Sequence, residues 1–104
     1  MNCTIGKAIV DVIAERKRQD NKWGEKNHKP EKWVAILGEE FGELCQSVVE
    51  TIFDNPVPDG GVYAGGFDNI RKEAIHVAAV AVAMVECIDR YGRQNWDVKI
   101  GFLK

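Results

Sequence analysis

The sequence predicts an all-α fold with three main helices per chain, and three observations lead to that prediction. Apolar residues recur at intervals of three and four over long stretches, which is the spacing of a helix with one buried face. No stretch alternates apolar and polar residues for long enough to build a sheet. Glycine and proline gather between the periodic stretches, where they end one helix before the next begins.

The first helix is expected over residues 4–21, with Thr4 as its N-cap and an apolar face made by Ile5, Ala8, Ile9, Val12 and Ile13. The chain beyond this face is rich in cations and closes with Trp23 and Gly24. Lys22 and Trp23 have two interpretations. They are either a solvated last turn with a hydrophobic plug, or a phosphate partner with a stacking surface for a base.

The second helix is expected over residues 31–53, entered through Pro30, which suits a first helical turn. Its apolar stripe is formed by Trp33, Val34, Leu37, Phe41, Leu44, Cys45, Val48 and Ile52. Residues 54–67 follow as a loop, because four glycines and two prolines cannot continue a helix. This loop is either a lid or partner contact, or a tolerated surface insertion.

The third helix is expected over residues 68–91, with Asp68 as its N-cap and Gly92 as the glycine that ends it. From Ala74 to Val85 the only polar side chain is His76, so this helix should be buried on every side. Two amphipathic helices cover it only in part. We therefore expect a four-helix-bundle-like core in a homodimer or tetramer. Residues 93–104 should form a short helix or an extended arm.

Length and composition indicate a single domain over residues 1–104, with 45% hydrophobic and 29% charged residues. A net charge of −2 gives no field that would attract duplex nucleic acid or an anionic membrane.

The three cysteines are widely spaced and without close pairs, which fits a reducing cytoplasm. No signal peptide is expected, because Asp11 interrupts the early apolar run. The run Val77–Val85 is far shorter than the roughly 20 residues that span a bilayer.

Acidic residues flank the apolar stripes of the second and third helices. Glu39, Glu40 and Glu43 share one side of the second helix, and Glu40 points towards its apolar face. Glu73 and His76 share a face of the third helix, near its start. A carboxylate buried there without a partner would cost several kcal/mol. Each of these residues can also be explained singly as a solvated acid, a first-turn glutamate or a core histidine.

If the second and third helices pack side by side, the pairs Glu40-x-x-Glu43 and Glu73-x-x-His76 bring four potential metal ligands together. Carboxylate oxygens suit Mg²⁺ or Mn²⁺, and Mg²⁺ commonly binds substrate phosphates as well. Such an ion neutralises charge on a phosphate chain and activates a water for attack. The spacing thus predicts a metal-dependent hydrolase of a phosphoanhydride.

Taken together, these motifs resemble a known family. The sequence Glu39-Glu40-x-x-Glu43, followed by Glu73-x-x-His76, is similar to the E-E-x-x-E and E-x-x-D signature of the MazG-like all-α nucleoside triphosphate pyrophosphohydrolases. The segments 15–24, 33–38 and 71–83 resemble those of small phage and prophage members. The resemblance covers roughly residues 9 to 90, and the combination is more specific than any single motif.

The resemblance implies hydrolysis of a (deoxy)nucleoside triphosphate to the monophosphate and pyrophosphate, with Mg²⁺ as cofactor. It implies an all-α bundle whose sites form in dimers or tetramers. The family's metal ligands correspond to Glu40, Glu43 and Glu73, and Glu39 corresponds to the first acid of the signature, which either supports the metal ligands or orients water. Arg18, Lys22 and Trp23 correspond to the part of the motif expected near the nucleotide.

His76 departs from the family signature, which has aspartate at this place. Neutral imidazole is a poorer ligand for Mg²⁺ and a better one for Mn²⁺, Fe²⁺ or Zn²⁺. Three consequences stay open: His76 binds a different metal, it orients a water or the substrate, or activity is reduced.

Two functions of other classes remain as alternatives. Glu73-x-x-His76 is also half of a di-iron carboxylate site, which a symmetric dimer would complete with a glutamate from each second helix. The chain could instead be a non-catalytic helical interaction module derived from the enzyme, with its acids retained as a solvated face.

Overall fold

The computed structural model describes residues 4–54 and 66–92, which form four helical elements. These are α1 (Thr4–Trp23), α2 (Pro30–Val49), a short π-helical turn η1 (Glu50–Asp54) that continues α2, and α3 (Gly66–Tyr91). No strand occurs in these two ranges, so the all-α prediction is confirmed for them. The expected tail 93–104 and nearly all of the expected loop 54–67 lie outside the described residues.

The C-terminal ends of α1 and α3 follow the local sequence signals. Gly24 and Gly92 have φ angles of 76° and 71°, in the left-handed region where glycine carries no steric penalty. The N–H of Gly24 donates to the carbonyl of Asp20 at 2.8 Å, and that of Gly92 to the carbonyl of Ile88 at 2.7 Å, ending α1 and α3. α3 begins at Gly66 rather than after Asp68, so Asp68 lies in its first turn instead of capping it.

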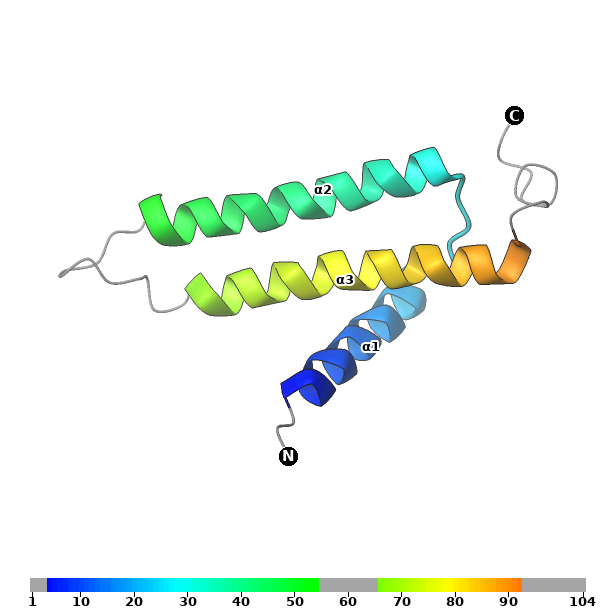
Figure 1. Cartoon of the computed structure of the whole chain (residues 1–104), viewed down its shortest axis with the longest axis horizontal. Coiled ribbons are helices and arrows are strands. Elements are labelled where there is room, and N and C mark those ends of the chain that lie inside the picture. The colour runs from blue at the N-terminus through cyan, green and yellow to red at the C-terminus, as the bar shows by residue number, and fades with distance from the viewer. Residues whose placement is uncertain (1–3, 55–65, 93–104) are drawn as a thin grey trace.

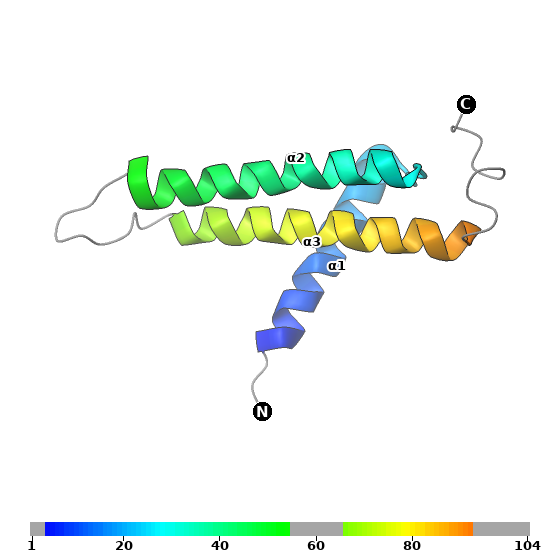
Figure 2. The same cartoon turned by 45° about the horizontal axis from the view of Figure 1, so that its top comes forward.

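α3 is the central element of the fold (Figures 1 and 2). α2 runs antiparallel beside it, while α1 crosses it at a steep angle, and both pack against it. The core lies where α2 begins and α3 ends. It consists of Trp33, Val80, Ala83 and Cys87, with Ile36, Leu37, Met84 and Tyr91 packed around them.

A second close contact joins the other ends of α2 and α3. Thr51 in η1 is buried, and its side chain packs directly against the backbone of Gly66. A Cβ atom at Gly66 would clash with that side chain, so this position requires glycine. The contact fixes where α3 starts relative to α2.

Two ion pairs tie α1 to α3. Arg16 Nε donates to Glu86 Oε1 at 2.6 Å, and Arg71 Nη2 donates to Asp11 Oδ2 at 2.7 Å. The Arg16 side chain is largely buried, whereas those of Glu86 and Arg71 are about half exposed. These bonds supplement a sparse apolar contact, because α1 contains no buried residue.

The expectation that the third helix is buried on every side is not met within a single chain. Val82 and Val85 on α3 are 40% and 55% exposed, because α1 and α2 leave part of its surface uncovered. The apolar face of α1 is open as well, with Ile5 68% and Ile9 52% exposed. Of the two cysteines that the structure describes, Cys87 is in the core, whereas Cys45, expected in the apolar stripe of the second helix, is exposed.

Across the described parts of the chain, no helix combines the length and the apolar character needed to cross a membrane.

Candidate metal centre and adjoining pocket

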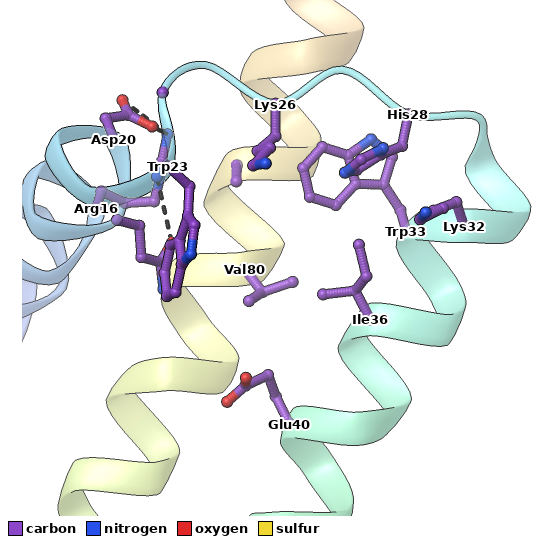
Figure 3. A pocket seen from close by; sticks show the side chains of 13 residues that line it. Arg16, Asp20, Trp23, Lys26, His28, Lys32, Trp33, Ile36, Glu40 and Val80 are labelled. Carbon is purple, nitrogen blue, oxygen red and sulfur yellow. Dashed lines mark hydrogen bonds and ion pairs between the residues drawn. The ribbon is translucent and has the colours of Figure 1, made fainter. Parts of the chain in front are cut away.

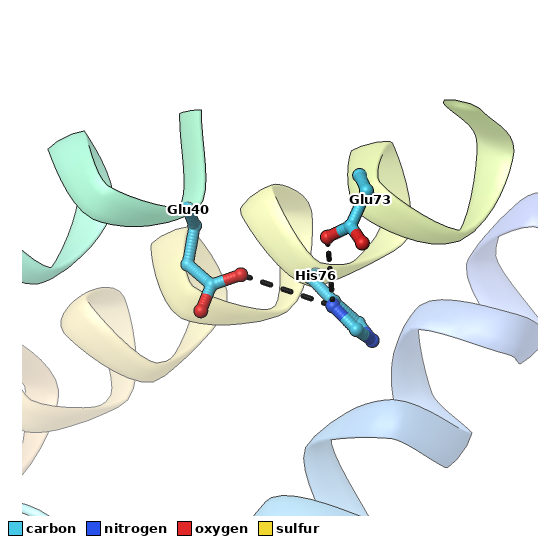
Figure 4. Close-up of side chains that lie close together, drawn as sticks. All are labelled: Glu40, Glu73 and His76. Carbon is cyan, nitrogen blue, oxygen red and sulfur yellow. Dashed lines mark ion pairs between the residues drawn. The ribbon is translucent and has the colours of Figure 1, made fainter. Parts of the chain in front are cut away.

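Three of the predicted metal ligands come together where α2 and α3 lie side by side (Figure 4). Glu40 projects from α2, and Glu73 and His76 project from successive turns of α3. One potential ligand atom of each lies within 4.8 Å of the others. His76 Nδ1 is 3.3 Å from Glu73 Oε1 and 3.8 Å from Glu40 Oε2. The i, i+3 spacing places Glu73 and His76 on one face, and the antiparallel packing supplies Glu40.

The two carboxylates are partly buried and incompletely paired. The side chains of Glu40 and Glu73 are 25% and 17% exposed. Glu40 Oε2 and Glu73 Oε1 are both buried and have no hydrogen-bond partner. The 3.3 Å approach of Glu73 Oε1 to His76 is within ion-pair range, but its geometry is not that of a hydrogen bond. A buried acceptor without a donor costs about 1–3 kcal/mol, so this arrangement favours a cation between the three side chains.

Glu40 has a raised pKa. Burial is the main cause, and the negative charge of Glu43 adds to it. Glu73 and Glu15 raise the pKa of Glu40 further, whereas His76 lowers it. The carboxylate is therefore destabilised in the metal-free protein, and a bound divalent cation would relieve the repulsion.

The other two predicted acids are not part of the cluster. Glu39 and Glu43 are exposed on α2, and the group of converging ligand atoms found among the described residues does not include either of them. Glu43 is nevertheless close enough to influence Glu40 electrostatically. Both carboxylates thus stand at the solvent side of the helix that carries Glu40.

Sequence reasoning assigned no role to Glu15, which α1 brings to the far side of the histidine. Glu15 Oε2 lies 3.7 Å from His76 Nε2, and its side chain is only 11% exposed. Its pKa is lowered, chiefly by hydrogen bonds from Arg18. An ionised carboxylate facing Nε2 suits a histidine that uses Nδ1 as a ligand, because metal-binding histidines usually present their other nitrogen to an acceptor. No local pattern pairs Glu15 with His76, since the contact depends on how α1 crosses α3.

A pocket of about 370 Å³ adjoins the cluster, and Glu40 lines one end of it (Figure 3). Its apolar wall is formed by Trp23, Trp33, Ile36, Val80 and Ala83. Its polar lining consists of Arg16, Gln19, Asp20, Lys26, His28 and Lys32 together with Glu40. Figure 3 shows Trp23 and Trp33 on opposite sides, with Val80 and Ile36 between them.

The predicted nucleotide-binding residues divide between two places. Trp23 lines the pocket and is 52% exposed, as a stacking surface requires. Lys22 Nζ lies 4.6 Å from the centre of the Trp23 ring, a cation–π contact, but does not line the pocket itself. Arg18 lines a separate groove together with Arg71, Lys72 and His76, and with Glu15 and Asp11, which pair with the two arginines.

Other pocket residues were missed at the sequence level. Lys26 and His28 belong to the polar linker between α1 and α2, and Lys32 is on the first turn of α2. The His28 ring meets Trp33 edge to face, with ring centres 4.8 Å apart. Burial lowers the pKa of His28, and the charges of Lys32 and Lys26 lower it further, so this ring is neutral near pH 7. The sequence feature that could have revealed these residues is the mixture of lysines and aromatic rings on both sides of Pro30, namely Lys26, His28, Lys32 and Trp33.

No family model matches the chain, and no curated protein and no solved structure matches it.

Proposed function

We propose that this chain is a metal-dependent nucleoside triphosphate pyrophosphohydrolase of the MazG-like type, which converts a (d)NTP and water to a (d)NMP and pyrophosphate. The observation that carries the proposal is the convergence of Glu40, Glu73 and His76, with ligand atoms within 4.8 Å. The sequence resemblance and the pocket at Glu40 support the same activity.

The donor set fits a divalent cation. Two carboxylates and one imidazole leave coordination positions for water and for phosphate oxygens, and they suit Mn²⁺ as well as Mg²⁺. The buried oxygens Glu40 Oε2 and Glu73 Oε1, which lack hydrogen-bond donors, are the atoms that such an ion would satisfy. We propose Mg²⁺ or Mn²⁺ as the cofactor, held by Glu40, Glu73 and His76.

When bound, the divalent cation would neutralise charge on the phosphate chain and lower the pKa of a coordinated water. Glu40 and Glu73 would hold it from two helices, so that their separation is fixed by the packing of α2 on α3. His76 would be kept in place by Glu15 behind its Nε2 atom. Glu39 and Glu43, exposed on α2, are the carboxylates available to orient the attacking water and accept its proton.

The two cavities suggest how a nucleoside triphosphate would lie. Glu40 lines the aromatic pocket and His76 lines the groove, in which Arg18 and Arg71 pair with Glu15 and Asp11 and Lys72 is a further cation. Because Glu40 and His76 are 3.8 Å apart, a triphosphate at the cluster can place its nucleoside on Trp23 and its terminal phosphates beside the cations. This orientation puts the bond to be cleaved over the metal ligands.

Self-association is part of the proposal. A homodimer or tetramer would cover apolar side chains that one chain leaves exposed on its helices, including Ile5, Ile9, Val10, Ile13, Phe41, Val82 and Val85. Such an amount of exposed apolar surface marks interaction sites in soluble proteins. In this assembly α3 would gain the neighbours that its apolar sequence requires.

The test is pyrophosphate release from a panel of dNTPs and NTPs, with Mg²⁺ or Mn²⁺, measured together with the nucleotide product. Wild type should release pyrophosphate and monophosphate in equal amounts, and Glu73→Gln should abolish this. Glu31→Gln is the matched control, because Glu31 is an exposed carboxylate in the first turn of α2 and does not belong to the cluster. Release of inorganic phosphate instead of pyrophosphate, or full activity in Glu73→Gln, would contradict the proposal.

One observation also favours a second function. Glu73-x-x-His76 and Glu40 are the half-site that a symmetric dimer would double into a di-iron carboxylate centre. Aerobic loading with Fe²⁺ decides between the two: stoichiometric iron with an oxo-bridge absorption band, and no turnover of nucleotides, would replace the hydrolase proposal.

A further inference from the structure

Resting on the proposed function, we infer that the pocket beside Glu40 selects nucleotides whose base presents a carbonyl edge and no exocyclic amino group, as uracil, thymine and hypoxanthine do, over the amino bases adenine and cytosine. The juxtaposition behind this inference is a set of hydrogen-bond donors without acceptors at the end of the pocket away from Glu40. Figure 3 shows Lys26, Trp33 and Lys32 gathered at that end, with Glu40 at the other.

Within the part of the chain that the structure describes, the side-chain N–H groups of these three residues donate no hydrogen bond. The indole Nε1 of Trp33 is buried and has no hydrogen-bond partner, and Trp33 as a whole is 3% exposed. The side chains of Lys26 and Lys32 line the pocket, and neither donates to an acceptor there. Lysine and the indole N–H donate and cannot accept, so all three groups call for acceptors on the ligand.

The three polar side chains that α1 contributes to the pocket are already paired. Arg16 donates to Gln19 Oε1 and to both carboxylate oxygens of Asp20. Gln19 Nε2 donates to Glu15. The other polar side chain at the lysine end is His28, whose ring contacts Trp33 and which has a further interaction of its own. Against Lys26, Lys32 and the Trp33 indole, an exocyclic amino group would place donors against donors, whereas a carbonyl oxygen supplies an acceptor.

The size and shape of the pocket suit one nucleoside. Its volume of about 370 Å³ lies at the lower end of the range for small-molecule sites. The exposed face of Trp23 provides a stacking surface, and stacking on an aromatic ring accepts any base. Discrimination between bases therefore falls to the edge contacts made by Lys26, Lys32 and Trp33.

The experiment uses two pairs of monophosphates that differ at the carbonyl or amino position: dIMP with dAMP, and dUMP with dCMP. Binding to the full chain is measured by calorimetric titration in EDTA, so that no metal or turnover is needed. The carbonyl member of each pair should bind roughly tenfold tighter, the ratio that corresponds to 1.4 kcal/mol. The double substitution Lys26→Met and Lys32→Met should bring both ratios close to one.

Lys17→Met is the control, because Lys17 is an exposed lysine of α1 that does not line this pocket. It should leave both ratios unchanged. Equal affinities within each pair, a preference for the amino base, an unchanged ratio in the double variant, or no binding of any monophosphate would each overturn the inference. A carbonyl preference without pyrophosphate release would sustain this inference and defeat the hydrolase. Pyrophosphate release without a preference for the carbonyl base would support the hydrolase and overturn this inference.

Discussion

Glu40 on α2 and His76 on α3 lie with Oε2 and Nδ1 3.8 Å apart. This approach joins two helices through groups that can both bind a metal, at a distance that leaves their polar atoms without a direct hydrogen bond. It also places the cluster between the aromatic pocket and the groove with Arg18, since Glu40 lines the former and His76 the latter. The chemistry that we propose depends on this pairing.

Replacing Glu40 by glutamine should stabilise the metal-free protein. The pKa of Glu40 is raised by burial and by neighbouring acids, so the folded chain binds this proton more tightly than the unfolded chain does. Stability is then lost as the pH rises above the ordinary value of 4.5, where the unfolded group ionises first. Near pH 7, Glu40→Gln should raise the free energy of unfolding by about 0.5–1 kcal/mol.

The check is urea denaturation in EDTA at pH 7 and at pH 4. The gain should be present at pH 7 and largely absent at pH 4, where Glu40 is protonated in both states. Equal stability of the two proteins at pH 7 would show that Glu40 is not destabilised in the absence of metal.

His76→Asp should move the metal preference towards Mg²⁺. Imidazole favours Mn²⁺, Fe²⁺ and Zn²⁺, whereas a third carboxylate favours the harder Mg²⁺. The ratio of Mn²⁺ to Mg²⁺ affinity, obtained by competition titration, should fall in this variant. An unchanged ratio would mean that His76 lies beside the metal without binding it, and would leave the histidine an orienting role.

The two ion pairs between α1 and α3 should differ in their effect on stability. Glu86→Gln removes the charge paired with the largely buried guanidinium of Arg16, and should cost about 1 kcal/mol of unfolding free energy. Arg71→Met breaks an ion pair with Asp11 in which the two side chains are 47% and 32% exposed. Because water screens this pair, the substitution should leave the midpoint of thermal unfolding unchanged. Thermal denaturation of both variants checks this. Equal losses would mean that burial of Arg16 does not strengthen its bond to Glu86.

Helical periodicity was sufficient to predict the three helices, but not how much of each apolar face is covered, since Ile5 on α1 and Val34 and Phe41 on α2 are more than half exposed. It also identified Glu73 and His76 as neighbours, because i, i+3 spacing fixes their relative position before any tertiary contact is known. Glu40 followed from its direction towards the apolar stripe. These residues were predictable because each depends on a single helix and its amphipathic face.

The rest of the candidate site depends on packing between helices. Glu15 reaches His76 only because α1 crosses α3 at that turn. The apolar composition of α3 predicted burial on every side, but composition does not reveal how many neighbours one chain supplies. Val85 is 55% exposed for that reason.

The most direct test of the account is calorimetric titration of the metal-free protein with Mn²⁺, because both the hydrolase and its di-iron alternative require a cation at this cluster. We predict one site per chain in wild type and in Glu31→Gln, and its loss in Glu73→Gln. Bound Mn²⁺ should also raise stability, by about 2.7 kcal/mol at one hundred times the dissociation constant. Absence of binding at millimolar Mn²⁺, or binding that survives Glu73→Gln, would contradict the assignment of Glu40, Glu73 and His76 as a metal centre.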